Sequence, residues 1–265
     1  MTEILGYLFS VLIGVSLGLI GGGGSILTVP ILVYIFGLSA EISTSYSLFI
    51  VGLTALFGSF TYYRSGLVNL KAALIFSVPS LVAVFLVRKY LMPSIPSSVF
   101  RTGGFIFTKD MLIMSVFSLL MIAASYSMIR NTKIPDSSKM KPGHHYTLIF
   151  LEGALVGALT GFLGAGGGFL IIPALVLLAG IPMKEAVGTS LLIIAIKSLL
   201  GFTGDISAGV NIDWFFLMIL SVFTVSGIYI GSALSKRIHA DKLKPAFGWF
   251  ILVMGIYILI RETLL

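Results

Sequence analysis

Residues 18–30 of the chain read GLIGGGGSILTVP, and residues 161–173 read GFLGAGGGFLIIP. Both stretches fit the pattern G-x-x-G-x-G-G-x-x-L-x-x-P, at an offset of 143 residues. Compositional bias produces chance matches of single glycines or leucines, but not a spaced pattern that recurs in register. The chain therefore contains an internal repeat. We place the two homologous halves at 1–130 and 146–265, joined by a polar linker at 131–145.

The composition is that of a membrane protein. Of 265 residues, 57% are hydrophobic and 10% are Asp, Glu, Lys or Arg, whereas a soluble domain carries about 25% charged residues. The mean hydropathy is +1.09, and a globular core could not hide this much apolar surface. These values exclude a soluble enzyme, a nucleic-acid-binding domain and a disordered protein. We expect an all-α polytopic protein of the cell membrane, in which the net charge of +7 reflects basic residues beside membrane segments.

Ten apolar stretches are expected to be helical. Two of them, 26–37 and 169–181, are too short to cross a bilayer comfortably, and each follows a glycine run. We therefore expect about five helical segments in each half, with a broken or re-entrant helix at the glycines near mid-membrane. The ten stretches are 4–20, 26–37, 42–62, 70–90, 109–130, 146–163, 169–181, 186–204, 212–235 and 245–260.

The glycine runs are expected to interrupt helices, because each Gly costs about 1 kcal/mol relative to Ala. Backbone groups freed inside hydrocarbon need a partner from the protein or from water. The half-helix after each run would present unpaired N–H groups, which suit an oxyanion; tight packing of small residues is the alternative. The predicted substrate-binding residues here are Gly21, Gly22, Gly23, Gly24, Ser25, Gly164, Gly166, Gly167 and Gly168.

Lys197 lies near the centre of the apolar stretch 186–204. An uncompensated Lys at that depth costs roughly 3 kcal/mol or more, so such a residue usually faces a partner or a wet cavity. A fixed positive charge near mid-membrane is what a permease for small anions would use, and Lys197 is therefore a predicted substrate-binding residue. The alternatives are snorkelling to the interface and pairing with Asp205, two turns further along the helix.

Three hydroxyls, those of Ser47, Thr189 and Ser190, complete the predicted substrate site, unless they bond back to their own helices. Glu152 could carry a coupling proton or lie at the membrane interface. No metal and no cofactor are expected, because the chain has no Cys and its three His fall in polar loops. No Gly-Lys-Ser or Gly-Lys-Thr ends either glycine run, so the sequence does not support an ATP-driven pump.

The motifs together resemble the TauE/SafE family of membrane permeases for sulfite and organosulfonates. The resemblance rests on the doubled glycine motif before L-x-x-P, on Thr189-Ser190-Leu191 and on the Gly-x-Val-Asn loop at 66–69. It covers essentially the whole chain. The first half departs from it at Ser45-Tyr46-Ser47, where the second half has Gly188-Thr189-Ser190.

The resemblance implies a permease and not an enzyme. Its expected substrate is a small sulfur-containing anion, such as sulfite or an organosulfonate, or a related organic acid. A cation carrier and a non-transporting sensor or assembly subunit are the alternatives. The expected partners are the anionic solute and the lipid bilayer, with no nucleic acid, and a homodimer is left open.

The basic residues predict how the two halves lie in the membrane. If each half crosses five times, the halves are inverted and eleven basic residues fall on one face against five on the other. With four crossings the split is nine to seven. The positive-inside rule favours the larger asymmetry, so we expect inverted repeats, a cytoplasmic linker and both termini outside. The five residues assigned to the outer face are Arg88, Lys89, Arg101, Lys109 and Arg261.

Overall fold

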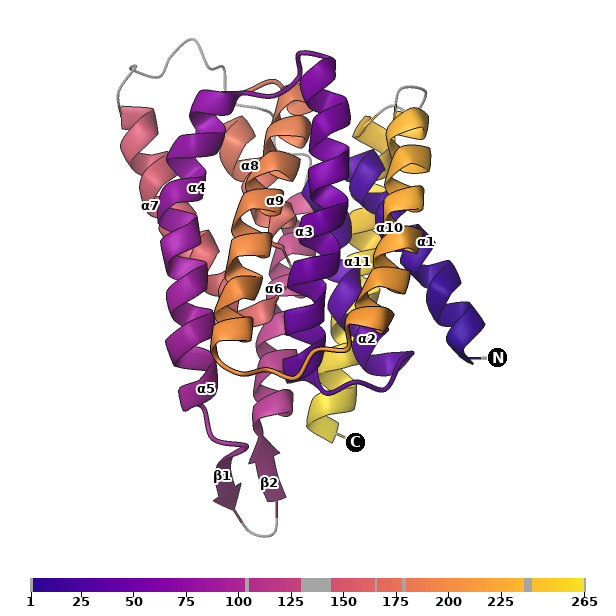
Figure 1. Ribbon diagram of the computed structural model, residues 1–265, viewed down its shortest axis with the longest axis vertical. Helices are drawn as coiled ribbons and strands as arrows, with labels where there is room; N and C mark the ends of the chain where they lie inside the picture. Colours follow the sequence, from indigo (N-terminus) through magenta and orange to yellow (C-terminus); the bar gives the residue numbers. More distant parts are fainter. Residues whose placement is uncertain are drawn as a thin grey trace.

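The computed structural model describes residues 2–102, 105–129, 144–164, 166–177, 180–235 and 240–264, and most of them are helical (Figure 1). The predicted linker 131–145 falls outside these residues except for its last two, which begin a helix. Every apolar stretch expected to be helical contains a helix, so the prediction of an all-α polytopic membrane protein is confirmed.

The first half contains α1 (Thr2–Ile20), a 3-10 helix η1 (Gly21–Leu27), α2 (Thr28–Tyr34), α3 (Ala40–Arg64), α4 (Leu70–Leu86), a π-helical turn η2 (Val87–Leu91), α5 (Met92–Ser94) and α6 (Lys109–Ile129). The second half contains α7 (His144–Leu163), α8 (Gly168–Leu177), α9 (Met183–Ser207), α10 (Trp214–Ser235) and α11 (Ala240–Leu264).

Local sequence signals set the helix boundaries. Ser39 caps α3 by accepting a hydrogen bond from the Ile42 N–H at 3.3 Å, and Asn69 caps α4 by accepting one from the Ala72 N–H at 3.0 Å. Just beyond the ends of α3 and α9, Gly66 and Gly209 take left-handed backbone angles, with φ of 69° and 81°. Glycine adopts such angles at little cost, which explains why both helices stop there.

Helices α3 and α9 form the buried centre of the bundle. They run antiparallel, because a Cβ at Gly188 near the start of α9 would lie 2.8 Å from Tyr62 Cβ near the end of α3. In the middle of both helices, a Cβ at Gly52 would lie 2.9 Å from Leu199 Cγ. Glycines thus allow the two central helices to approach closely.

The outer helices pack across the two halves of the chain. Helix α1 packs on α10 and α7 packs on α4, while α6 packs on α11. The glycines of α1 make the first contact: a Cβ at Gly18 would lie 2.5 Å from Ile228 O of α10. Gly161 of α7, at the same offset of 143, faces Val84 of α4, with its Cβ position 3.0 Å from Val84 Cα. Small residues thus allow both helix pairs to approach closely.

The outer surface is suited to lipid. Among the described residues, five helical stretches are long and apolar enough to cross a membrane: Ala40–Arg64, Leu70–Ser94, Lys109–Tyr126, Lys184–Ser207 and Trp214–Ser235. Large apolar side chains are exposed on the outer helices, including Leu74, Leu155, Phe215, Val222 and Val253. Such a surface is favourable in hydrocarbon and unfavourable in water, so the chain is a multi-pass membrane protein.

A short hairpin that the sequence did not reveal connects α5 to α6. Strands β1 (Ser98–Thr102) and β2 (Phe105–Thr108) pair antiparallel, and the rings of Phe100 and Phe107 stack with centroids 4.9 Å apart. The hairpin projects from the lower end of the bundle in Figure 1, the end at which α11 also finishes, whereas α7 begins at the upper end. The inversion of the halves and their orientation in the membrane stay predictions.

Candidate functional site

The two glycine runs meet at the centre of the molecule. A Cβ at Gly22 would collide with Gly168 Cα, and a Cβ at Gly168 would collide with Gly22 Cα. The runs differ in local form, because Gly21–Leu27 is a 3-10 helix that continues into α2, whereas Gly166 and Gly167 make a turn from which α8 starts at Gly168. Backbone of one half therefore touches backbone of the other half where both helices are interrupted.

Each glycine run also contacts the central helix of the opposite half. A Cβ at Gly21 would lie 3.0 Å from Val187 Cγ1 and 3.2 Å from Ser190 Oγ, both on α9. At the same offset of 143, a Cβ at Gly164 would collide with the carbonyl oxygen of Thr44 on α3. Both glycines have positive φ, 70° and 67°, so both their backbone angles and their surroundings disfavour any side chain.

Lys197 lies at the second glycine turn. Its side chain is 1% exposed, and Nζ donates a hydrogen bond to Thr160 Oγ1 of α7 at 2.9 Å. A Cβ at Gly167 would lie 2.8 Å from this Nζ. The two glycine runs and Lys197, which the sequence predicted as parts of one site, therefore lie together, and Thr160 joins them.

The structure excludes both alternatives considered for Lys197. A side chain that is 1% exposed does not snorkel to an interface. Asp205 is ion-paired with Arg88 instead, with Oδ2 3.5 Å from Nη1. Among the described residues, the ammonium of Lys197 therefore has a hydroxyl, and no carboxylate, as its partner.

The predicted hydroxyls separate into different roles. Ser25 donates to Gly22 O at 2.7 Å and Ser190 donates to Val187 O at 2.8 Å, so both bond back to their own segments. Thr189 accepts a hydrogen bond from the Asn69 N–H at 2.9 Å and thereby holds the loop before α4. Ser47 is buried, and its Oγ has no partner among the residues that the structure describes. Gly23 lies in the 3-10 helix and Gly24 packs on α1.

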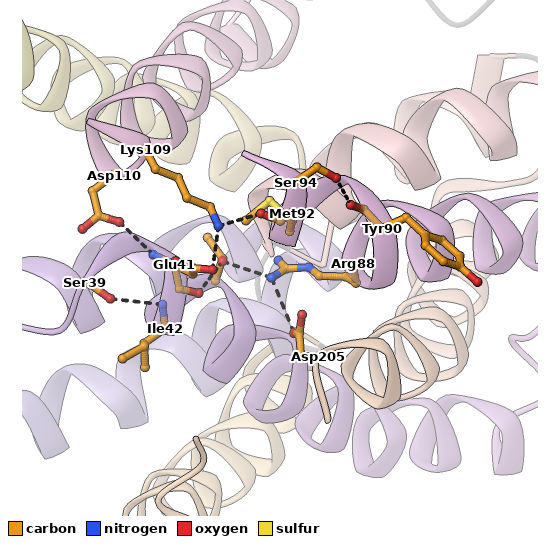
Figure 2. Close-up of polar contacts among 11 residues, drawn as sticks. Ser39, Glu41, Ile42, Arg88, Tyr90, Met92, Ser94, Lys109, Asp110 and Asp205 are labelled. Atoms are coloured by element: carbon orange, nitrogen blue, oxygen red, sulfur yellow. Dashed lines mark hydrogen bonds and ion pairs between the residues drawn. The ribbon is translucent and has the colours of Figure 1, made fainter. Parts of the chain in front are cut away.

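A second charged cluster lies at one end of the central helices (Figure 2). Arg88 of η2 is 1% exposed, and its Nη1 donates to Thr44 Oγ1 at 3.1 Å and to Asp205 Oδ2 at 3.5 Å. Beside it, Lys109 Nζ donates to Glu41 Oε1 and to the carbonyl oxygen of Met92, both at 2.6 Å. The cluster joins α3, η2, α6 and α9.

Two residues of this cluster were assigned wrongly from the sequence. Arg88 and Lys109 were counted as surface charges that report topology, but both are buried and ion-paired. Without them, three of the five residues assigned to the outer face remain, which strengthens the predicted asymmetry. A signal was present for Arg88, because it interrupts the apolar stretch 70–90 instead of following it.

Glu152 is partly buried in α7, and its Oε2 has no hydrogen-bond partner in the described part of the chain. A part for Glu152 in proton coupling stays a prediction. No group of three His, Cys, Asp or Glu that could hold a metal ion occurs among the described residues.

Comparison with known proteins agrees with this architecture. The family described as "Sulfite exporter TauE/SafE" matches residues 7–258. A protein of Xylella fastidiosa (strain Temecula1) named "Probable membrane transporter protein" is 30% identical over 260 residues, which cover 95% of this chain and 92% of that protein. No solved structure matches significantly.

More distant relatives carry the same description. "Probable membrane transporter protein YdhB" of Bacillus subtilis is 26% identical and covers 94% of this chain and 96% of its own length. "Probable membrane transporter protein MJ0441" of Methanocaldococcus jannaschii is also 26% identical, over 94% of this chain and 92% of its own. From the match along nearly the whole chain, the interrupted helices and the lipid-facing surface, we conclude that the chain belongs to the TauE/SafE family of membrane transporters.

Proposed function

We propose that the protein is a secondary permease that moves a small sulfur-containing oxyanion, sulfite or an organosulfonate, or a related organic acid, across the cell membrane. The observation that carries this proposal is the buried ammonium of Lys197 at the second glycine turn. A buried cation without a counter-ion is costly in a membrane. An anion that enters beside it removes that cost, so the site favours anions over neutral or cationic solutes.

The polar backbone near Lys197 would serve the same solute. The turn at Gly166 and Gly167 leads directly into α8, which presents its first N–H groups at Gly168 and the residues after it. Such groups carry positive partial charge and bind oxyanions. Gly22 and Gly168 abut in this structure, so passage of a solute between them requires the two halves to move apart. Relative movement of two repeats around a central site is the usual basis of alternating access.

The carboxylates of the bundle do not favour the cation-carrier alternative. Asp205 pairs with Arg88, and Glu41 pairs with Lys109. A cation carrier needs carboxylates that converge on an unpaired site. These two already have basic partners, and Glu152 is a single carboxylate rather than part of a converging set among the described residues, which supports the anion as the substrate class.

The proposal is tested by flux in proteoliposomes. Radiolabelled sulfite uptake is measured with and without an imposed proton gradient, and sulfoacetate and acetate are added as competitors. Lys197→Met should lower the apparent affinity about 10- to 100-fold, the range expected for loss of a hydrogen bond to a charged group. Lys197→Arg should retain part of it, because the charge stays while the shape changes.

Lys184→Met is the matched control, since it removes one positive charge from an exposed position at the start of the same helix. It should transport as the unmodified protein does. If Lys197→Met and Lys184→Met have the same affinity and rate, Lys197 does not bind the solute. If the unmodified protein moves none of the three anions, the proposed substrate class is wrong.

A further inference from the structure

The guanidinium of Arg88 is buried but only partly satisfied. It lies on the π-helical turn η2, is 1% exposed, and forms its recorded hydrogen bonds through Nη1 alone. Nε and Nη2 have no hydrogen-bond partner among the residues that the structure describes. Figure 2 shows the side chain reaching from its helix toward Asp205 and the start of α3. The Nε–Nη2 edge of this buried cation therefore carries donors that the described protein groups do not satisfy.

The chemistry of that edge indicates what the ligand should be. Nε–H and one Nη2–H form a rigid pair of parallel donors that matches two oxygens of a carboxylate, sulfonate or similar oxyanion. The ion pair with Asp205 does not use this edge, because it involves Nη1 only and has a length of 3.5 Å. If Arg88 served only to pair with Asp205, we would expect two parallel N–H···O hydrogen bonds between the guanidinium and the carboxylate.

Arg88 is also connected to the glycine turn. Thr44 accepts the hydrogen bond of Arg88 Nη1 through Oγ1, and the carbonyl oxygen of the same Thr44 abuts Gly164. Asp205 follows Lys197 by eight residues on α9, a rise of about 12 Å along the helix axis. Lys197 is part of α9, and Arg88 is paired with Asp205 of the same helix. The two cations therefore lie at successive depths along α9.

The fold itself does not demand a charge at this position. Tyr62 occupies the position 143 residues before Asp205, at the end of α3. Its Oη forms hydrogen bonds with Gly18 O and Ser235 Oγ, both at 3.3 Å. Neutral groups are thus sufficient where the other central helix ends. The charged pair at the end of α9 needs a reason other than packing.

We propose that Arg88 is a second anion-binding residue of the permeation path. It binds the oxyanion through Nε and Nη2, while Asp205 is its counter-ion when no anion is present. The anion would pass between Arg88 and Lys197 by exchanging one cation for the other. This inference rests on the proposed function, because it assumes that the transported solute is an oxyanion.

The test is equilibrium binding of sulfite to the purified full-length protein by calorimetry under nitrogen, together with flux in proteoliposomes. Arg88→Gln should weaken sulfite binding about 10- to 100-fold. Arg88→Lys should restore binding only partly, since an ammonium lacks the paired donors. Lys89→Gln, the neighbouring loss of one charge, should bind sulfite with the original Kd.

The direction in which the sulfite Kd changes in Asp205→Asn decides whether Arg88 binds the anion. If Arg88 binds the anion, removal of the competing carboxylate should leave the sulfite Kd unchanged or lower it, and should increase the stabilisation that sulfite gives in thermal unfolding. Weaker sulfite binding by folded Asp205→Asn would overturn the proposal, as would an unchanged Kd in Arg88→Gln. Should Arg88→Gln fail to fold, the Asp205→Asn result decides alone.

The two proposals fail in different ways. If the unmodified protein neither binds sulfite nor moves any of the tested anions, the proposed function has failed, and the role of Arg88 fails with it. If the unmodified protein binds sulfite and Lys197→Met does not, but Arg88→Gln binds it normally, only the second binding residue is refuted.

Discussion

The contact between Gly22 and Gly168 makes a sharp prediction for a single methyl group. Neither residue has positive φ, so Ala at either position suffers no backbone strain and would gain about 1 kcal/mol of helix propensity in an unobstructed helix. A Cβ at Gly22 would collide with Gly168 Cα and would lie 2.9 Å from the Gly168 carbonyl carbon. Any loss of stability in Gly22→Ala therefore reports the collision alone.

The size of the loss follows from these distances. Carbon atoms are optimally 3.5–4.0 Å apart, so even the 2.9 Å contact is short by about 0.6–1.1 Å, and the Gly168 backbone cannot rotate away. The methyl group would also collide with Ile194 Cδ1, a side-chain atom that can move. Overpacking of this kind costs about 1–3 kcal/mol. For a chain of this size, the melting temperature should fall by about 2–4 °C per kcal/mol, and transport should fall with it because the repeats no longer fit.

The assay is thermal unfolding followed by size-exclusion chromatography, together with sulfite flux. Gly255→Ala is the matched control, because its Cβ would lie no closer than 3.1 Å to any neighbour and its helix conformation is ordinary. It should lose less stability than Gly22→Ala or Gly168→Ala, because its closest contacts of 3.1 Å are tight but are not collisions. If both Gly22→Ala and Gly168→Ala melt as Gly255→Ala does and transport fully, the two glycine runs do not touch in the protein.

Further predictions address the packing, the charged cluster and the orientation. The double variant Thr54→Cys, Thr224→Cys should form a disulfide between α3 and α10 on mild oxidation. The two threonine hydroxyl oxygens are 2.7 Å apart, and a disulfide needs Cβ atoms about 3.5–4.5 Å apart. The absence of a cross-link on non-reducing gels would contradict this contact. Glu41→Gln should lower the free energy of unfolding by no more than about 1 kcal/mol, because the Glu41 side chain is 44% exposed. Lys109→Met should lower it further, because it leaves the carbonyl oxygen of Met92 without its donor. Equal melting temperatures for the two variants would refute this difference. Ser138→Cys, in the predicted cytoplasmic linker, should resist an impermeant maleimide added to intact cells, and labelling from outside would reverse the orientation.

Much of the architecture was readable from the chain. The ten apolar stretches and the two glycine runs predicted helices that the structure contains, because apolar length and helix-breaking residues act locally. Lys197 stood out because a charged residue in the middle of an apolar stretch is expensive wherever the chain folds. The hairpin 98–108 was missed, since its few residues give a much weaker pattern than a membrane helix.

The sequence by itself determined the membrane class, the internal repeat, the positions of the interrupted helices and one buried cation. Only the tertiary structure decided what these parts touch. Arg88 and Asp205 are 117 residues apart in the chain, and the reach from Lys197 to Thr160 joins two different helices. Such pairs depend on how helices distant in sequence cross. Hydropathy measures the cost of placing a single side chain in a membrane. It contains no information on which distant residue will lie beside that side chain and offset the cost.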